Sequence, residues 1–307
     1  MELDALVAGG EYRSRKLELV RDANGDRVAE LAVVPPLLVA RCVAAQRGAR
    51  PLPVVERAPV LARAADVFAG DVLGGLGFDE YVALTSRAAG LPISVARAGA
   101  RAVLDGLRSA HVSVGAARPA GAAFGARTSD ASAVWARRGD VLAVHASGNA
   151  PGVHGLWPQS LLLGYRVAVR PSRREPFTAH RLILALRSAG LPAADAVYLP
   201  TDHAGADELV RCSDLALVYG GQDVADRYRG DDTVKVNGPG RSKIVVGADW
   251  EPWLDVIADS VAHLGGTACV NATAVLVDGD PVLLARALAE RLAALAPPPP
   301  RGPAPPP

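Results

Sequence analysis

From residue 140 onward, short apolar runs alternate with longer helical patterns, and this alternation limits the possible folds more than any other feature. Helical spacing of apolar residues covers the ranges 176–189, 206–212, 250–263 and 281–294. Strands separated by helices are typical of parallel βαβ units. We therefore predict an α/β fold, with a Rossmann-like parallel sheet and helices on both faces. The apolar runs that fit short buried strands are 141–146, 167–169, 196–199, 215–218, 243–246 and 274–277.

The first part of the chain has a different pattern. Two strands are expected at 17–21 and 28–34 around the turn sequence 22–26, Asp-Ala-Asn-Gly-Asp. Helices are expected after them, and the Gly- and Ala-rich stretch 112–136 is expected to be irregular. Residues 296–307 are dominated by proline, which predicts a disordered, extended tail. The helices of this part are expected at 37–46, 59–68, 79–89 and 92–110.

Charge and cysteine usage narrow the class of protein. The chain has 33 basic and 32 acidic residues and no basic block, which argues against nucleic acid or an anionic membrane as a partner. Its apolar runs are short and its start lacks the pattern of a signal peptide. Three scattered cysteines do not form a disulfide framework, and the histidines lack metal-ligand spacing. We expect a cytoplasmic protein without a metal site.

Parallel sheets bind ligands at the carboxyl ends of their strands, so the loops after 146, 169 and 218 are the first candidates for a site. The loop 147–152 reads Ser-Gly-Asn-Ala-Pro-Gly, and Asn149 could donate a hydrogen bond to a developing oxyanion. An ordinary strand-to-helix turn would have a similar composition.

The next two loops suit a nucleotide. Arg170, Ser172 and Arg173 lie in the sequence Arg-Pro-Ser-Arg-Arg-Glu-Pro, and guanidinium groups before a helix favour a phosphate. The same cluster also fits a solvated loop. Gly220 and Gly221 follow a strand and would let a pyrophosphate approach the backbone, although a single Gly-Gly pair is a weak signal.

Cys269 lies in the sequence Gly-Gly-Thr-Ala-Cys-Val-Asn, after a helix and a glycine turn and before a strand. A thiolate in this position could attack a carbonyl or thioester carbon. An inert buried thiol is the alternative. The chain contains no GxSxG motif for a serine nucleophile and no Walker P-loop.

In order and spacing, these motifs resemble the aldehyde dehydrogenase superfamily across about residues 1–295. Asn149-Ala150-Pro151 is similar to the family's Asn-x-Pro, and Arg170-Pro171-Ser172 is similar to its Lys-Pro-Ser. The stretch 237–242, Asn-Gly-Pro-Gly-Arg-Ser, resembles Glu-Leu-Gly-Gly-Lys-Ser, and 266–269 resembles Gly-Gln-x-Cys. The resemblance implies that Cys269 is the nucleophile and that Asn149 stabilises the oxyanion. It also implies that Arg170, Ser172, Arg173, Gly220 and Gly221 hold the cofactor.

One departure from the family pattern changes the expected reaction. Asn237 stands where the family has its general-base Glu, which an aldehyde oxidiser needs to activate water. The sequence Gly-Pro-Gly-Arg-Ser at 238–242 resembles that of the acyl-CoA reductase branch of the superfamily. That resemblance implies reduction of an acyl thioester of CoA or a carrier protein to an aldehyde, with NADPH as hydride donor. Aldehyde oxidation with NAD or NADP is the alternative, and Arg170 and Arg173 favour NADP because arginine pairs with a 2′-phosphate.

The second departure concerns length, since family members continue well beyond the nucleophile. The resemblance implies a nucleotide-binding domain over 1–245, a partial and C-terminally truncated catalytic domain over 246–295, and the tail 296–307. A homo-oligomer or a second chain that supplies the missing part is an expected partner. A non-catalytic nucleotide-binding remnant, or a partner subunit of a truncated enzyme, is the other alternative.

Overall fold

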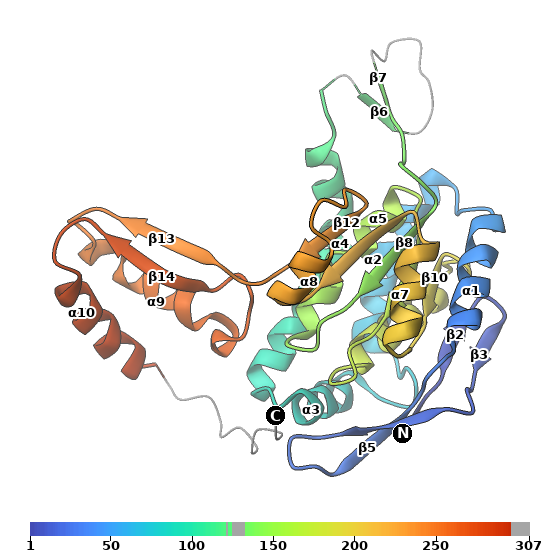
Figure 1. Ribbon diagram of the computed structural model, residues 1–307, viewed down its shortest axis with the longest axis horizontal. Coiled ribbons are helices and arrows are strands. Elements are labelled where there is room, and N and C mark those ends of the chain that lie inside the picture. Colours follow the sequence, from blue (N-terminus) through green and yellow to red (C-terminus); the bar gives the residue numbers. More distant parts are fainter. Residues whose placement is uncertain (121, 125–132, 296–307) are drawn as a thin grey trace.

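In the computed structural model, which describes residues 1–120, 122–124 and 133–295, a seven-stranded sheet forms the centre of the fold (Figure 1). The strand order is β12-β11-β8-β9-β10-β2-β3. Neighbours from β12 to β10 are parallel, whereas β2 is antiparallel to β10 and to β3. The strands are Ala5–Val7 (β2), Gly10–Tyr12 (β3), Val141–His145 (β8), Arg166–Arg170 (β9), Ala196–Tyr198 (β10), Leu215–Tyr219 (β11) and Val234–Asn237 (β12).

The strand order reverses beside β8. The chain lays β9 and β10 on one side of β8, and then crosses to place β11 and β12 on the other side. Because these strands are parallel, the loops after β8 and β11 leave the same edge and diverge. Such a switch point is where open α/β sheets bind ligands, so the fold predicts a site between these two loops.

Helices cover both faces of the sheet, as the sequence predicts. One core joins alternate residues of β8 and β9, such as Val144 and Val169, to α6 (Phe177–Ser188). The other joins their neighbours, such as Ala143 and Ala168, to Val39 and Leu209. Strands with both faces buried explain why their sequences are continuous apolar runs. The first face is covered by α2 (Val54–Gly70), α4 (Ile93–Ala117), α5 (Pro158–Leu162) and α6, and the second by α1 (Pro36–Gly48) and α7 (His203–Cys212).

The predicted N-terminal hairpin is present as β4 (Leu17–Arg21) and β5 (Arg27–Ala32), with β1 (Glu2–Leu3) beside β5. Asp22 forms its turn, because Asp22 Oδ1 accepts hydrogen bonds from the backbone N–H groups of Asn24 and Asp26, both at 3.0 Å. The helix α3 (Phe78–Ala89) follows α2 and ends at Gly90, which has a positive φ of 66°.

The last described part forms a separate two-stranded parallel sheet, β13 (Ser242–Val246) and β14 (Ala272–Val277), which extends to one side of the central sheet (Figure 1). Helices α9 (Leu254–Ala262) and α10 (Pro281–Ala293) pack against β14. The expected domain boundary at residue 245 falls inside β13. No described helix combines the length and apolar character needed to cross a membrane.

One expectation about local structure was wrong, and one strand was not expected. The stretch 112–136 is not irregular throughout, because α4 continues to Ala117 and two short strands follow, β6 (Ala122–Phe124) and β7 (Ala133–Trp135). Residues 121 and 125–132 of that stretch, and the predicted tail 296–307, lie outside the described residues. The strand β12 has no counterpart in the sequence prediction, because Lys235 and Asn237 interrupt its apolar pattern.

Candidate active site

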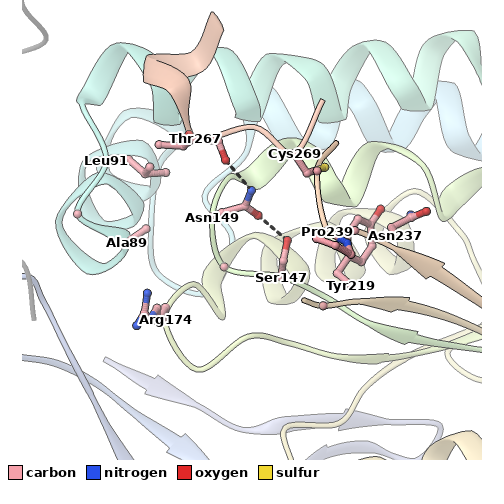
Figure 2. Close-up of a pocket in the computed structure, with 15 residues that line it drawn as sticks. Ala89, Leu91, Ser147, Asn149, Arg174, Tyr219, Asn237, Pro239, Thr267 and Cys269 are labelled. Atoms are coloured by element: carbon pink, nitrogen blue, oxygen red, sulfur yellow. Dashed lines mark hydrogen bonds between the residues drawn. The ribbon is translucent and has the colours of Figure 1, made fainter. Parts of the chain in front are cut away.

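A pocket of about 480 Å³ lies at the switch point of the central sheet (Figure 2). Its walls come from the loops after β8, β9, β11 and β12, the α3–α4 connection and the turn before β14. The size is within the range of small-molecule sites. The lining residues are Ala89, Gly90, Leu91, Ser147, Gly148, Asn149, Arg174, Tyr219, Gly220, Asn237, Gly238, Pro239, Gly240, Thr267 and Cys269.

Asn149 is held between two parts of the pocket wall. Its Oδ1 accepts a hydrogen bond from Ser147 Oγ at 2.5 Å, and its Nδ2 donates to the carbonyl oxygen of Thr267 at 3.0 Å. The second bond joins the loop after β8 to the turn that carries Cys269 (Figure 2). Because an amide nitrogen carries two N–H donors, one donor of Asn149 remains for a ligand.

The long helix α4 fixes the segment that follows Asn149. That segment is a 3₁₀ turn, Pro151–Gly155, and it packs on two glycines of α4. A methyl group at Gly99 would collide with Pro151, and one at Gly106 would collide with the backbone of Gly155. The absence of a Cβ at both positions therefore lets the turn lie close to the helix and orients the loop carrying Asn149.

Cys269 is exposed and follows a turn in which both glycines have a positive φ, 69° at Gly265 and 74° at Gly266. The predicted glycine turn is therefore present, and glycine tolerates this conformation without strain. The backbone of Cys269 packs against Gly240, where any side chain would collide with the Cys269 carbonyl. In Figure 2 the sulfur points away from Asn149 and towards the side of the pocket that holds Asn237.

The opposite wall carries Tyr219 and Asn237 at the ends of β11 and β12. Tyr219 OH donates a hydrogen bond to the carbonyl oxygen of Val153 at 3.2 Å, and burial raises the pKa of Tyr219. Gly220 N–H donates to the Asn237 carbonyl at 3.2 Å. A side chain at Gly220 would collide with Val224 of α8 (Gln222–Arg227). The absence of a side chain at Gly220 is therefore also needed for packing within the protein.

The arginines at the end of β9 and in the loop after it lie in two different environments. Arg170 is half-buried and donates from Nε to the carbonyl oxygen of Thr201 at 3.4 Å, and Arg173 Nε pairs with Glu18 Oε2 at 3.0 Å. Burial, followed by the charge of Arg173, lowers the pKa of Arg170. Arg174 instead lines the pocket. Ser172 Oγ accepts a hydrogen bond from the Arg174 backbone N–H at 3.2 Å, which shapes the loop.

The pocket thus brings together Asn149, Gly220 and Cys269 of the predicted site residues. Arg170, Ser172, Arg173 and Gly221 lie outside its lining. Sequence reasoning missed Thr267, Arg174 and the wall 89–91, and only Arg174 had a usable signal, its place in the arginine cluster.

Two histidines near the sheet edge stay neutral at pH 7. Burial lowers the pKa of His145 to about 4, and it lowers the pKa of His154 to about 3. His154 Nδ1 accepts a hydrogen bond from Trp157 Nε1 at 3.0 Å, which anchors the turn after Asn149. Within the part of the chain that the structure describes, no group of three His, Cys, Asp or Glu side chains could hold a metal ion.

Several solved structures with this fold are aldehyde dehydrogenases. An indole-3-acetaldehyde dehydrogenase in complex with NAD+ has a TM-score of 0.80 at 20% identity, over 96% of this chain and 63% of that one. The aldehyde dehydrogenase KauB from Pseudomonas aeruginosa gives 0.78 at 19% identity, over 96% and 63% of the two chains. An NAD-dependent aldehyde dehydrogenase from Sinorhizobium meliloti gives 0.77 at 19% identity, over 98% and 64%.

The chain therefore has the aldehyde dehydrogenase fold and spans less than two thirds of the length of these structures. No protein-family description matches the sequence. No curated protein matches it by sequence either.

Proposed function

We propose that the chain is an NAD(P)-dependent oxidoreductase of the aldehyde dehydrogenase type, and that it reduces an acyl thioester to an aldehyde. In this reaction one acyl thioester, one NADPH and one proton give an aldehyde, a free thiol and NADP+. The acyl donor is a thioester of CoA or of a carrier protein. The fold, the site at the switch point and the exposed thiol within it support the proposal.

The residues present fit a nicotinamide dinucleotide. The pocket lies at the crossover of the strand order, which is where dinucleotides bind to folds of this kind. Gly148 and Gly220 line it, Arg170 ends β9, and Arg173 lies in the loop that follows. Those two guanidinium groups favour the 2′-phosphate of NADP. When bound, the reduced cofactor supplies the hydride for the reaction.

The proposed chemistry of the chain's own residues begins at Cys269. Its thiolate attacks the carbonyl carbon of the thioester, the new C–S bond forms, and the old C–S bond breaks to release the thiol. The free N–H of Asn149 and the backbone N–H of Cys269 donate to the carbonyl oxygen as negative charge develops. No described residue accepts a hydrogen bond from the Cys269 N–H, so it is available for this role. Hydride addition to the acyl carbon then breaks the Cys269–acyl bond and frees the aldehyde.

One observation favours reduction over oxidation. None of the described residues that line the pocket is Asp or Glu, and Asn237 occupies the wall near Cys269. Oxidation requires a base that activates water to hydrolyse the acyl-enzyme. Asn237 has no basic group, so an acyl group on Cys269 would persist until hydride reaches it.

The test is a steady-state assay with an acyl-CoA and NADPH, followed at the absorbance of NADPH and by aldehyde trapping. The proposal predicts one aldehyde formed for each NADPH consumed. Asn237→Glu should divert the acyl-enzyme to free acid, because it restores a carboxylate to the pocket wall. Faster oxidation of aldehyde to acid by the unmodified protein would favour the aldehyde-oxidising alternative.

A second candidate is a nucleotide-binding protein without thioester chemistry. It is favoured by the bare face of the β13–β14 sheet, where Val245 and Leu276 are neighbours and are 77% and 55% exposed. Parallel sheets are normally covered on both faces, and a nucleophile needs a closed, preorganised site. Binding of NADPH without any acylation of Cys269 would support this candidate. A second copy or a complementing chain over this face is the partner that we propose for an active enzyme.

A further inference from the structure

Arg174 gives the pocket its charge. Of the described lining residues it alone carries a formal charge, and the other polar groups are neutral hydroxyls, amides and the thiol. Figure 2 shows Arg174 and Cys269 at opposite ends of the pocket, with Asn149 between them. A ligand that fills the pocket therefore meets a positive charge at one end and the nucleophile at the other.

The guanidinium group of Arg174 is free to bind such a ligand. Its neighbours in the loop are engaged, since Arg170 donates to the Thr201 carbonyl and Arg173 pairs with Glu18. The side chain of Arg174 is exposed, and within the described ranges it forms neither a hydrogen bond nor an ion pair. Because the Arg174 side chain has no partner within the described ranges, it does not stabilise the fold through an ion pair. All of its N–H donors are therefore available to bind an oxyanion.

The position of Arg174 is also fixed by the protein. Its backbone N–H donates to Ser172 Oγ at 3.2 Å, and its Cβ lies against Gly148, where a side chain would collide with it and with Ser172. The loop after β9 is thereby fitted to the loop after β8. The start of the Arg174 side chain is held at the pocket wall, and the flexible end can reach the ligand.

We infer that Arg174 binds a phosphate group of the ligand that occupies this pocket, at the end opposite Cys269. This inference deepens the proposed function, on which it rests for the identity of the ligand. A phosphate suits Arg174 better than a single carboxylate, because its higher charge gains more from the guanidinium fork. Two sources supply such a phosphate, the dinucleotide cofactor and the CoA or phosphopantetheine arm of the thioester.

The first test uses a probe that needs no catalysis. Calorimetric titration of the full chain with inorganic pyrophosphate should give binding that Arg174→Gln weakens by about tenfold or more, as expected for a lost charge-assisted contact. Arg174→Lys should retain part of the affinity. Arg41→Gln is the matched control, because Arg41 is also exposed but lies on α1, and it should leave the affinity unchanged.

Two further measurements distinguish the sources of the phosphate. If the cofactor is the source, Arg174→Gln also weakens NADPH binding about tenfold. If the thioester is the source, NADPH binding is unchanged and the variant slows acylation of Cys269 by acyl-CoA, but not by the acyl thioester of N-acetylcysteamine, which lacks phosphate. Either result supports the inference.

The inference is overturned if Arg174→Gln binds pyrophosphate, NADPH and acyl-CoA as the unmodified chain does, or if the unmodified chain binds none of them. Its failure is separable from that of the proposed function. If the Arg174→Gln variant binds all three ligands normally and its Cys269 is acylated normally by acyl-CoA, the inference fails and the proposed reaction still stands. Loss of pyrophosphate binding in a chain whose Cys269 is never acylated would leave the phosphate site standing without the reaction.

Discussion

Asn149 Nδ2 donates a hydrogen bond to the carbonyl oxygen of Thr267 at 3.0 Å, two residues before Cys269. The bond joins the central sheet to the turn that carries Cys269, across 118 residues of sequence. In the proposed reaction Asn149 therefore has two tasks. One N–H positions the Cys269 turn, and the other stabilises the developing oxyanion.

Asn149→Ala removes both donors. Loss of an oxyanion donor lowers a rate by roughly 10²–10³, so we expect acylation of Cys269 by an acyl-CoA to slow by at least that factor. Alkylation of Cys269 by iodoacetamide develops no oxyanion and should not slow. Stopped-flow measurement of both reactions checks the prediction. An equal slowing of both would mean that Asn149 acts only by holding the turn.

The fit between α4 and the turn 151–155 predicts opposite effects for two glycines of one helix. Gly106→Ala places a methyl group against the Gly155 backbone and should destabilise the fold by about 1–3 kcal/mol. Gly115→Ala meets nothing within 4 Å and should stabilise it by up to about 1 kcal/mol, through helix propensity. Urea unfolding of both variants measures the difference. Equal effects would show that the turn does not pack as described.

The buried Glu175 predicts a pH dependence of stability. Burial raises the pKa of Glu175 from 4.5 to about 7. The carboxyl group is fully buried, its Oε1 accepts from the Thr178 N–H at 2.8 Å, and its Oε2 has no partner among the described residues. A raised carboxyl pKa contributes stability that is fully present below pH 4.5 and is lost as pH rises through about 7.

Glu175→Gln removes this contribution. The free energy of unfolding of the unmodified chain, relative to the variant, should therefore fall by about 1–3 kcal/mol between pH 4.5 and pH 7. Buried histidines such as His154 act in the opposite direction but are common to both chains, so the difference isolates Glu175. Glu56→Gln, at an exposed position on α2, should show no such trend. Denaturation at several pH values decides the matter, and a constant difference would contradict the assignment.

Substitutions of Arg173 and of its ion-pair partner Glu18 should have opposite effects on the affinity for NADPH. Arg173→Ala should lower the affinity for NADPH by about tenfold and leave that for NADH unchanged, because only NADPH carries the 2′-phosphate. Glu18→Gln frees Arg173 from its 3.0 Å ion pair and should maintain or raise the affinity for NADPH. Fluorescence titration with both cofactors provides the measurement. Tenfold better use of NADH by the unmodified chain would remove the preference for NADP.

Much of the fold could be predicted from the sequence, because its central strands are buried on both faces. Such strands appear as short apolar runs, and those expected at 141–146 and 215–218 match β8 and β11 within one residue at each end. The end of α4 could not be predicted from the sequence, because Gly115 and several alanines are also typical of a loop. Only the packing of Val114 in the core shows that the helix continues. Tertiary contacts override weak propensity in such places.

The candidate site could be predicted from the sequence only in part, for a geometric reason. The sequence indicates that loops at the carboxyl edge meet, which groups Asn149 and Gly220. It does not indicate which way each side chain of one loop points, so Arg173 and Arg174 could not be distinguished. The contact of Asn149 with Thr267 joins residues 118 positions apart and leaves no local signal.

Intact-mass spectrometry after incubation with a panel of acyl-CoA thioesters tests the central claim most directly. Burial raises the pKa of Cys42 to about 11, and burial together with Glu208 raises that of Cys212, so both thiols should react slowly. Attack of Cys269 on the thioester predicts one acyl adduct on the unmodified chain and none on Cys269→Ala. A folded chain that binds NADPH but gains no adduct, or an adduct that survives in Cys269→Ala, would contradict it.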